Sequence, residues 1–228
     1  MYLEVQKVSK HFYVNREQIT AVDQVSLIIK PGETIGILGV SGSGKTTLGQ
    51  IIAGLQKPDE GDIIIEGKKI KYPYKGDIRT KIQILFQQPE ASFNPRKTLW
   101  NSLKEPYILH KIPVTREKLS DYLTAFGLYP EHLDRYPREL SGGELQRAAL
   151  ARILVLKPEI IVLDEATSML DSISQAQMIH MLEQIRKNHL ISYVFISHDY
   201  ELTQYFCDKI YWIEKGKLKG ENENGNIK

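Results

Sequence analysis

Alternating apolar and polar residues mark the first segments of the chain, with the spacing of half-buried strands. Leu3 to Val8 alternates clearly and Ala21 to Ile29 more loosely, as expected where one face of a sheet is buried. The polar stretch Asn15 to Thr20 between them is typical of a hairpin. Thr34 to Leu38 is predicted as a buried strand that runs into Gly39.

The pattern changes along the rest of the chain. Thr46 to Leu55 has helical spacing, whereas Asp62 to Glu66 and Ile82 to Phe86 are strand-like. From Gln87 to about Pro158 strand patterns stop and helical periodicity takes over. The other predicted helices are Trp100 to Leu109, Arg116 to Phe126, Gly143 to Leu156 and Ser174 to Lys187, and the other strands are Ile160 to Leu163, Tyr193 to Ser197 and Lys209 to Glu214.

This order predicts a single domain of the α/β class in which a helical block interrupts a sheet-based core. The core is expected at residues 1–86 and 159–218, the inserted helical subdomain at residues 87–158, and a disordered polar tail at residues 219–228.

Composition narrows the class of protein. A net charge of +2 over 228 residues argues against a nucleic-acid binder that relies on phosphate neutralisation. The apolar runs are far shorter than the roughly 18 residues of a membrane span, and no signal-peptide pattern opens the sequence. The cytosol is therefore the expected compartment. Cys207 is the one cysteine, so no disulfide can form within the chain. We interpret its side chain as a small, buried apolar group.

A glycine-rich segment between a predicted strand and a predicted helix indicates a phosphate loop. Gly39 and Gly44-Lys45-Thr46 have the required spacing, and the flanking elements distinguish this loop from a flexible glycine turn. Glycines let backbone N–H groups converge on phosphate oxygens, Lys45 supplies a charge to the outer phosphates, and the Thr46 hydroxyl suits Mg²⁺. The residues expected to bind nucleotide here are Gly39, Ser41, Gly42, Ser43, Gly44, Lys45, Thr46 and Thr47.

Two carboxylates follow the buried strand that begins at Ile160. Asp164 and Glu165 are expected at the carboxyl edge of the sheet, where open α/β sheets bind ligands. Asp164 suits Mg²⁺ held through water, and Glu165 suits orienting or deprotonating an attacking water. Alone, such a pair is more typical of a helix start, but beside a phosphate loop it favours catalysis.

Two further polar residues follow predicted strands. His198 is expected to contact the γ-phosphate and the attacking water, and Gln87 to reach both Mg²⁺ and that water. Taken alone, Gln87 would be interpreted as a turn residue. The other histidines are interpreted as structural or exposed; they are His11, His110, His132, His180 and His189.

A second glycine-rich segment, LSGGELQR at Leu140 to Arg147, completes a set of motifs that resembles the ATP-binding-cassette ATPases. The resemblance extends from Leu3 to about Lys217. It implies a P-loop NTPase core, with a mostly parallel sheet flanked by helices and an antiparallel β-subdomain, together with ATP and Mg²⁺ as cofactors. It also implies that Ser141, Gly142 and Gly143 cap the γ-phosphate of a nucleotide held by a partner subunit.

The same resemblance assigns roles to other positions. Gln87 would sense Mg²⁺ and contact the membrane partner, and His198 would be the switch histidine. Ser168 to Asp171 would cross the dimer interface, which makes Asp171 part of the facing nucleotide site. Phe12 would stack on adenine, with a buried core phenylalanine as the alternative.

Two positions depart from the family pattern. Val40 replaces a residue that is often polar or acidic, and Glu144 replaces the more usual glutamine. Neither change removes a group with an essential role, so hydrolysis is still expected.

Part of the sequence resembles one branch of the family more specifically. Phe86 to Leu99 and Ala166 to Asp171 are similar to the ATPases of peptide and nickel importers. This implies a second ATPase subunit (a paralogue or a second copy), two membrane permeases, an extracellular binding protein that acts indirectly, and a place on the cytoplasmic face of the membrane. Phe93, Trp100 and Tyr107 would line a groove for a permease helix, or else form the core of the helical subdomain.

The expected function is therefore the ATP-hydrolysing motor of an importer for peptides or nickel complexes. An exporter ATPase is the alternative within transport, and a soluble cassette ATPase that acts on DNA or ribosomes is the alternative outside it. The long coiled coil of chromosome-maintenance relatives and the second cassette of translation-factor relatives are missing from the sequence. A nucleotide kinase would leave Leu140 to Glu144 unexplained.

Overall fold

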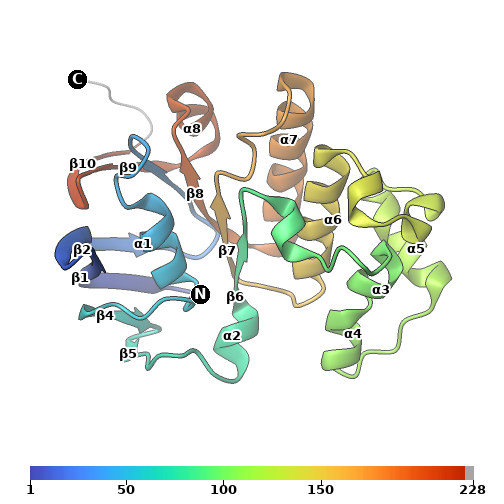
Figure 1. The fold of residues 1–228 in the computed structure, drawn as a ribbon, viewed down its shortest axis with the longest axis horizontal. Coiled ribbons are helices and arrows are strands. Elements are labelled where there is room, and N and C mark those ends of the chain that lie inside the picture. The colour runs from blue at the N-terminus through green and yellow to red at the C-terminus, as the bar shows by residue number, and fades with distance from the viewer. Residues whose placement is uncertain (224–228) are drawn as a thin grey trace. The chain divides into compact units, whose positions relative to one another are not determined.

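The computed structural model describes residues 1–223, which divide into two compact units. Unit 1 consists of Met1–Ile84, Glu159–Glu165 and the segment from Ile185 onward, and it contains both sheets (Figure 1). Unit 2 consists of Leu85–Pro158 and Ala166–Gln184 and is mainly helical.

An antiparallel sheet of four strands, in the order β2-β1-β4-β5, contains the first part of the chain. Its strands are β1 (Leu3–Val14), β2 (Glu17–Ile29), β4 (Glu60–Ile65) and β5 (Lys68–Lys69). Asn15 and Arg16 join β1 to β2 with φ of 52° and 70°, the left-handed pair that a tight hairpin requires. This sheet confirms the antiparallel β-subdomain that the family resemblance implied.

A six-stranded sheet, in the order β10-β9-β3-β8-β7-β6, forms the other layer. Its strands are β3 (Thr34–Leu38), β6 (Ile82–Leu85), β7 (Ile160–Asp164), β8 (Ser192–Ser197), β9 (Lys209–Glu214) and β10 (Lys217–Glu223). β7, β8, β3 and β9 run parallel, and β10 returns antiparallel to β9. The predicted mostly parallel core sheet is confirmed, and its parallel strands place the ends of β3, β7 and β8 at one edge.

Helices α1 (Lys45–Ile52) and α8 (Tyr200–Phe206) cover opposite faces of this sheet. Ile35 and Ile37 of β3 belong to the same buried cluster as Leu48 and Ile51 of α1. Gly36, between them, faces α8, and a Cβ on Gly36 would lie 2.4 Å from the Thr203 side chain. Because side chains alternate along a strand, these contacts assign one helix to each face, and α1 is thereby buried between the two sheets.

Helices occupy much of the block that was expected to be helical, residues 87–158. Unit 1 contains a further short helix, α2 (Asp77–Lys81), directly before β6. The helices that begin in unit 2 are η1 (Pro89–Ser92), α3 (Leu99–Leu103), α4 (Glu105–Leu109), α5 (Arg116–Thr124), η2 (Pro130–Asp134), η3 (Pro137–Glu139), α6 (Gly142–Leu154) and α7 (Ser172–His189).

Two segments differ from the sequence-based expectation. Trp100 to Leu109, expected as one helix, is split into α3 and α4, because Pro106 has no N–H to donate to the carbonyl of Ser102. β10 extends to Glu223 by pairing with β9, where a disordered tail was expected from residue 219. The remaining part of that tail, residues 224–228, lies outside the described residues. Within residues 1–223, no helix combines the length and apolar character needed to cross a bilayer.

Candidate functional site

The phosphate loop connects β3 to α1 through backbone conformations that favour glycine. Gly42 and Gly44 have φ of 74° and 105°, in the left-handed region where other residues are strained. A Cβ on Gly44 would lie 2.0 Å from the carbonyl oxygen of Ala21, and one on Gly39 would lie 2.3 Å from that of Ile213. The loop is therefore folded tightly against the rest of unit 1, and only small residues fit its turns.

Lys45 is buried and folded back over the loop. Its Nζ donates to the carbonyl oxygens of Gly39 at 2.8 Å and Val40 at 3.0 Å. Burial lowers the pKa of Lys45, and the nearby carboxylates of Glu165 and Asp164 oppose that shift. The ammonium group is thus held over the loop by oxygen atoms that a phosphate can replace.

Ser43 shows that the loop fits a phosphate group. The Ser43 hydroxyl oxygen is buried and has no hydrogen-bond partner, which is costly unless a ligand satisfies it. The space beside Gly42 is open, since a Cβ there would meet no atom within 4 Å. A free hydroxyl, open space and the start of α1 suit the β- and γ-phosphates of a nucleotide.

Asp164, the last residue of β7, lies against the first turn of α1. The Thr46 hydroxyl donates to Asp164 Oδ1 at 3.0 Å. Burial raises the pKa of Asp164, while the bond from Thr46 lowers it and the charge of Glu165 raises it further. Among residues 1–223 no three or more His, Cys, Asp or Glu side chains gather as a metal site, and Mg²⁺ commonly uses few protein ligands together with substrate phosphates. Thr46 and Asp164 fit that pattern.

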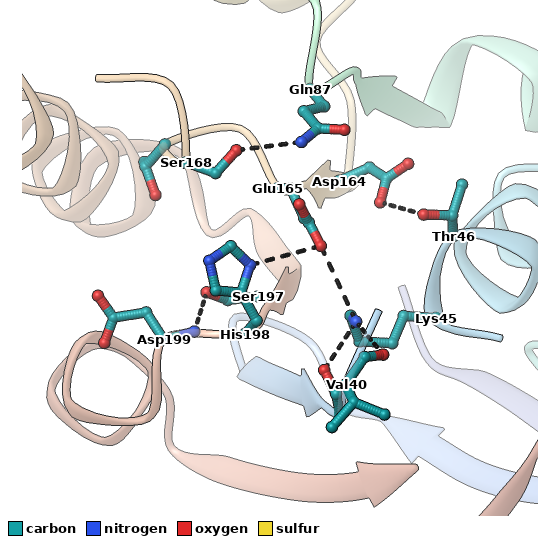
Figure 2. Close-up of polar contacts among 12 residues, drawn as sticks. Val40, Lys45, Thr46, Gln87, Asp164, Glu165, Ser168, Ser197, His198 and Asp199 are labelled. Atoms are coloured by element: carbon teal, nitrogen blue, oxygen red, sulfur yellow. Dashed lines mark hydrogen bonds and ion pairs between the residues drawn. The ribbon is translucent and has the colours of Figure 1, made fainter. Parts of the chain in front are cut away.

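Glu165 and His198 face each other at the same edge of the sheet (Figure 2). Glu165 Oε1 lies 3.6 Å from His198 Nδ1 and 3.9 Å from Lys45 Nζ. Glu165 adopts a φ of 47°, and its N–H donates to Ile196 at 3.0 Å. This left-handed conformation is uncommon for a residue other than glycine. This bond to β8 holds the backbone of Glu165, and the Glu165 side chain points toward the phosphate loop.

Gln87 belongs to unit 2. Its Nε2 donates to the Ser168 hydroxyl at 3.4 Å (Figure 2), and the Gln146 side chain donates to the neighbouring carbonyl of Phe86, also at 3.4 Å. Asp171 caps the start of α7, accepting from the N–H groups of Ile173 and Ser174 at 3.1 and 3.0 Å. Hydrogen bonds therefore hold both ends of the expected interface segment, Ser168 to Asp171.

The second glycine-rich segment, Leu140 to Arg147, hereafter the signature segment, contains the N-terminus of α6. The Ser141 hydroxyl accepts the N–H of Glu144 at 3.2 Å, and Glu144 Oε2 accepts the N–H of Ser141 at 2.8 Å. This reciprocal capping leaves the Ser141 hydroxyl hydrogen and the N–H groups of Gly142 and Gly143 for an anion. The side chain of Ser141 is exposed, as an anion cap requires.

Phe12 lies in β1 and is 37% exposed, so the alternative of a buried core phenylalanine does not hold. Lys10 Nζ lies 5.8 Å from the centre of the Phe12 ring. An exposed ring fits stacking on adenine, which stays a prediction. By contrast, Phe93 is buried beneath Arg152, whose guanidinium carbon lies 5.7 Å from the ring centre.

Unit 1 therefore brings Lys45, Thr46, Asp164, Glu165 and His198 together, whereas Gln87, Ser141 and Asp171 belong to unit 2. His132, interpreted from the sequence as structural or exposed, is buried and lies 3.4 Å from Glu144. The one sequence feature that pointed to this contact was the glutamate at position 144.

Comparison with known proteins identifies similar sequences. The model of the ABC transporter family matches residues 22–168. The chain is 40% identical over 230 residues to "Oligopeptide transport ATP-binding protein AppF" of Bacillus subtilis (strain 168), covering 95% of this chain and 70% of the relative. It is 37% identical over 213 residues to "Nickel import ATP-binding protein NikE" of Pseudomonas putida, covering 90% and 78%.

A solved structure has the same fold. The structure described as "Dimeric structure of a post-hydrolysis state of the ATP-binding cassette MJ0796 bound to ADP and Pi" superposes with a TM-score of 0.86 at 29% identity. The match covers 99% of this chain and 100% of that one. The agreement of sequence and fold extends over both units.

Proposed function

The chain belongs to the ATP-binding-cassette (ABC) transporter family, and we propose that it is the ATP-hydrolysing subunit of an importer for peptides or nickel complexes. The observation that carries the catalytic part is the convergence of Lys45, Thr46, Asp164, Glu165 and His198 at one edge of the parallel sheet. The transport part is supported by the names of the relatives.

In this proposal ATP binds with its phosphates on the loop from Gly39 to Thr47. Lys45 exchanges its carbonyl partners for β- and γ-phosphate oxygens, and the Ser43 hydroxyl gains the partner it lacks. Thr46 and Asp164 hold Mg²⁺, which would supply charge stabilisation to the phosphates. The exposed ring of Phe12 stacks on the adenine.

Glu165 is the proposed base or orienting group for the attacking water. Its carboxylate lies between Lys45 and His198, so it faces the place where the γ-phosphate would lie. His198 is 61% exposed on its side chain and is free to turn toward that phosphate. Gln87 of unit 2 is proposed to contact the water and the Mg²⁺ shell and to report them to a permease.

The signature segment is proposed to serve a second subunit, either a paralogue or another copy of this chain. Ser141, Gly142 and Gly143 would cap the γ-phosphate held by that subunit, and Asp171 would align the facing site. The dimeric cassette that matches in fold supports this arrangement. Two permeases and, indirectly, an extracellular binding protein complete the proposed assembly at the cytoplasmic face of the membrane.

The catalytic assignment is tested with Glu165→Gln, which keeps the side-chain shape and removes the carboxylate. Because general-base assistance contributes roughly 10²–10⁴-fold, ATP hydrolysis is expected to fall by at least about 100-fold while ATP binding persists. Hydrolysis rate and equilibrium nucleotide binding are measured on the same preparation. Unchanged hydrolysis would refute the role of Glu165.

The signature assignment is tested with Ser141→Arg. A large cation at the exposed start of α6 is expected to prevent ATP-dependent dimer closure and to suppress hydrolysis. Binding of ATP to the isolated subunit should stay the same, because the phosphate loop is intact. A loss of that binding would show that Ser141 does not act in the way proposed.

A further inference from the structure

His132 is the buried histidine of unit 2, and its hydrogen bonding defines its tautomer. It lies in η2 with 4% of its surface exposed. The N–H of Tyr129 donates to His132 Nδ1 at 2.8 Å. Since an imidazole nitrogen that accepts carries no hydrogen, the hydrogen of the neutral ring is on Nε2.

The Nε2 atom that carries this hydrogen lies near the carboxylate of Glu144. His132 Nε2 lies 3.4 Å from Glu144 Oε1, while Glu144 Oε2 accepts the N–H of Ser141. The two carboxylate oxygens thus lie near two different N–H groups. The bond from Ser141 is the main cause of a lowered pKa at Glu144, so the side chain is a carboxylate at neutral pH.

Glutamine at position 144 would not match these two donors. A glutamine amide has one oxygen and one NH₂ group. If its oxygen accepted the N–H of Ser141, its NH₂ group would face the Nε2 hydrogen of His132, and two donors would meet. The glutamate that departs from the family pattern is therefore the residue that a donating His132 requires.

We infer that His132 is a positioning residue for the signature segment: through Glu144 it fixes Ser141 at the start of α6, in the geometry that caps the phosphate of a facing nucleotide. This inference rests on the proposed role of Ser141. The Glu144 carboxylate accepts the N–H of Ser141, and the Glu144 N–H donates to the Ser141 hydroxyl oxygen. The hydroxyl is then oriented to donate outward, and rotation of Glu144 would release it.

A double-mutant cycle with His132→Asn and Glu144→Gln tests this coupling. Asparagine places its side-chain oxygen near the position of Nδ1, so it still accepts from Tyr129 but offers nothing to Glu144. Each single variant is expected to lower kcat for ATP hydrolysis roughly five- to tenfold, while the Kd for ATP of the isolated subunit stays unchanged. The double variant should be no slower than either single one, because the mismatch at position 144 exists only while His132 donates.

Two controls accompany the cycle. His110→Asn changes an exposed histidine of the same unit, and it should leave kcat unchanged. A long-range ¹H–¹⁵N spectrum of the wild-type protein should show the Nε2-protonated tautomer of His132, independently of any variant that folds poorly. The Nδ1-protonated tautomer would overturn the inference.

Failure of the inference is distinguishable from failure of the proposed function. If Ser141→Arg suppresses hydrolysis but His132→Asn and Glu144→Gln have no effect, or multiply in the double variant, then the positioning role is wrong and the signature assignment stands. If Ser141→Arg itself leaves hydrolysis intact, the signature assignment is wrong, and the positioning role that rests on it is overturned as well.

Discussion

Asp164 illustrates at the scale of one residue how a functional site opposes stability. It is 5% exposed, and burial raises the pKa of its carboxyl group. Such a charge costs free energy in the folded protein and is retained for binding rather than for folding. Thr46 compensates for part of that cost by donating to Oδ1.

The variant Asp164→Asn should therefore stabilise the nucleotide-free protein. Asparagine retains an oxygen for Thr46 and removes the buried charge. A gain of about 1 kcal/mol corresponds to a rise in Tm of roughly 2–4 °C in a chain of this size. Calorimetry without nucleotide measures the rise, and an ATPase assay should show lost turnover. A lower Tm would mean that the attraction of Lys45 outweighs the burial of Asp164.

Residue-level chemistry was predictable where it depends on local spacing. The phosphate loop from Gly39 to Thr46 is such a case, because its backbone geometry fixes the residue types over a few positions. The contact between Thr46 and Asp164 joins residues 118 positions apart, and it could be anticipated only because parallel strands end at one edge. The left-handed backbone of Glu165 depends on the bond to β8, which no local pattern indicates.

At the scale of elements, α6 organises unit 2. Besides the signature at its start, it carries Arg152, which donates to the carbonyl of Ser92 in η1 and forms an ion pair with Glu105 of α4 at 2.5 Å. Gln146 of the same helix donates to the carbonyl of Phe86. α6 thus contacts both ends of the segment that contains Gln87.

Replacing Arg152 by methionine should destabilise the protein by about 1–3 kcal/mol, because a backbone carbonyl and the carboxylate of Glu105 lose their shared donor. Urea unfolding measures this change. Lys97→Met is the matched control: Lys97 also pairs with Glu105, at 2.8 Å, but its side chain is 47% exposed. An exposed pair of that kind contributes about 0–1 kcal/mol. Equal losses from both variants would contradict the organising role of Arg152.

Elements were predictable where burial gives a long, clear pattern. The strands Thr34–Leu38 and Lys209–Glu214 match their expected bounds. The short helix Tyr200–Phe206 was not anticipated, since seven residues carry little periodicity. The register of β10 depends on its partner β9, and a polar sequence gives no indication of that pairing.

At the scale of the whole molecule, the residues proposed to bind nucleotide are divided between two units. The phosphate loop and Glu165 lie in unit 1, and the signature lies in unit 2. The amino-acid composition excluded some classes of protein but said nothing about a division into two parts. That division was expected from the helical periodicity of the middle block and from the family resemblance. In the proposed assembly each nucleotide site also requires a second subunit, which a single chain cannot display.

Binding of ATP with Mg²⁺ should stabilise unit 1. At a concentration 100 times Kd the gain is about 2.7 kcal/mol, or roughly 5–10 °C in Tm for a chain of this size. Scanning calorimetry at several ATP concentrations measures it. Lys45→Ala should abolish most of the shift, and an equal shift in that variant would place the nucleotide elsewhere.

The position of Lys45 has a consequence for selectivity among nucleotides. Its ammonium group has already left bulk water and is held by two carbonyl groups of its own loop. A ligand must therefore compete with those carbonyls rather than with water, and only closely spaced anionic oxygens offer a better exchange. A nucleoside monophosphate has no second phosphate to offer in exchange, and we expect it to leave the lysine where it is. The folded loop is therefore expected to favour nucleotides with a longer phosphate chain before any chemistry begins.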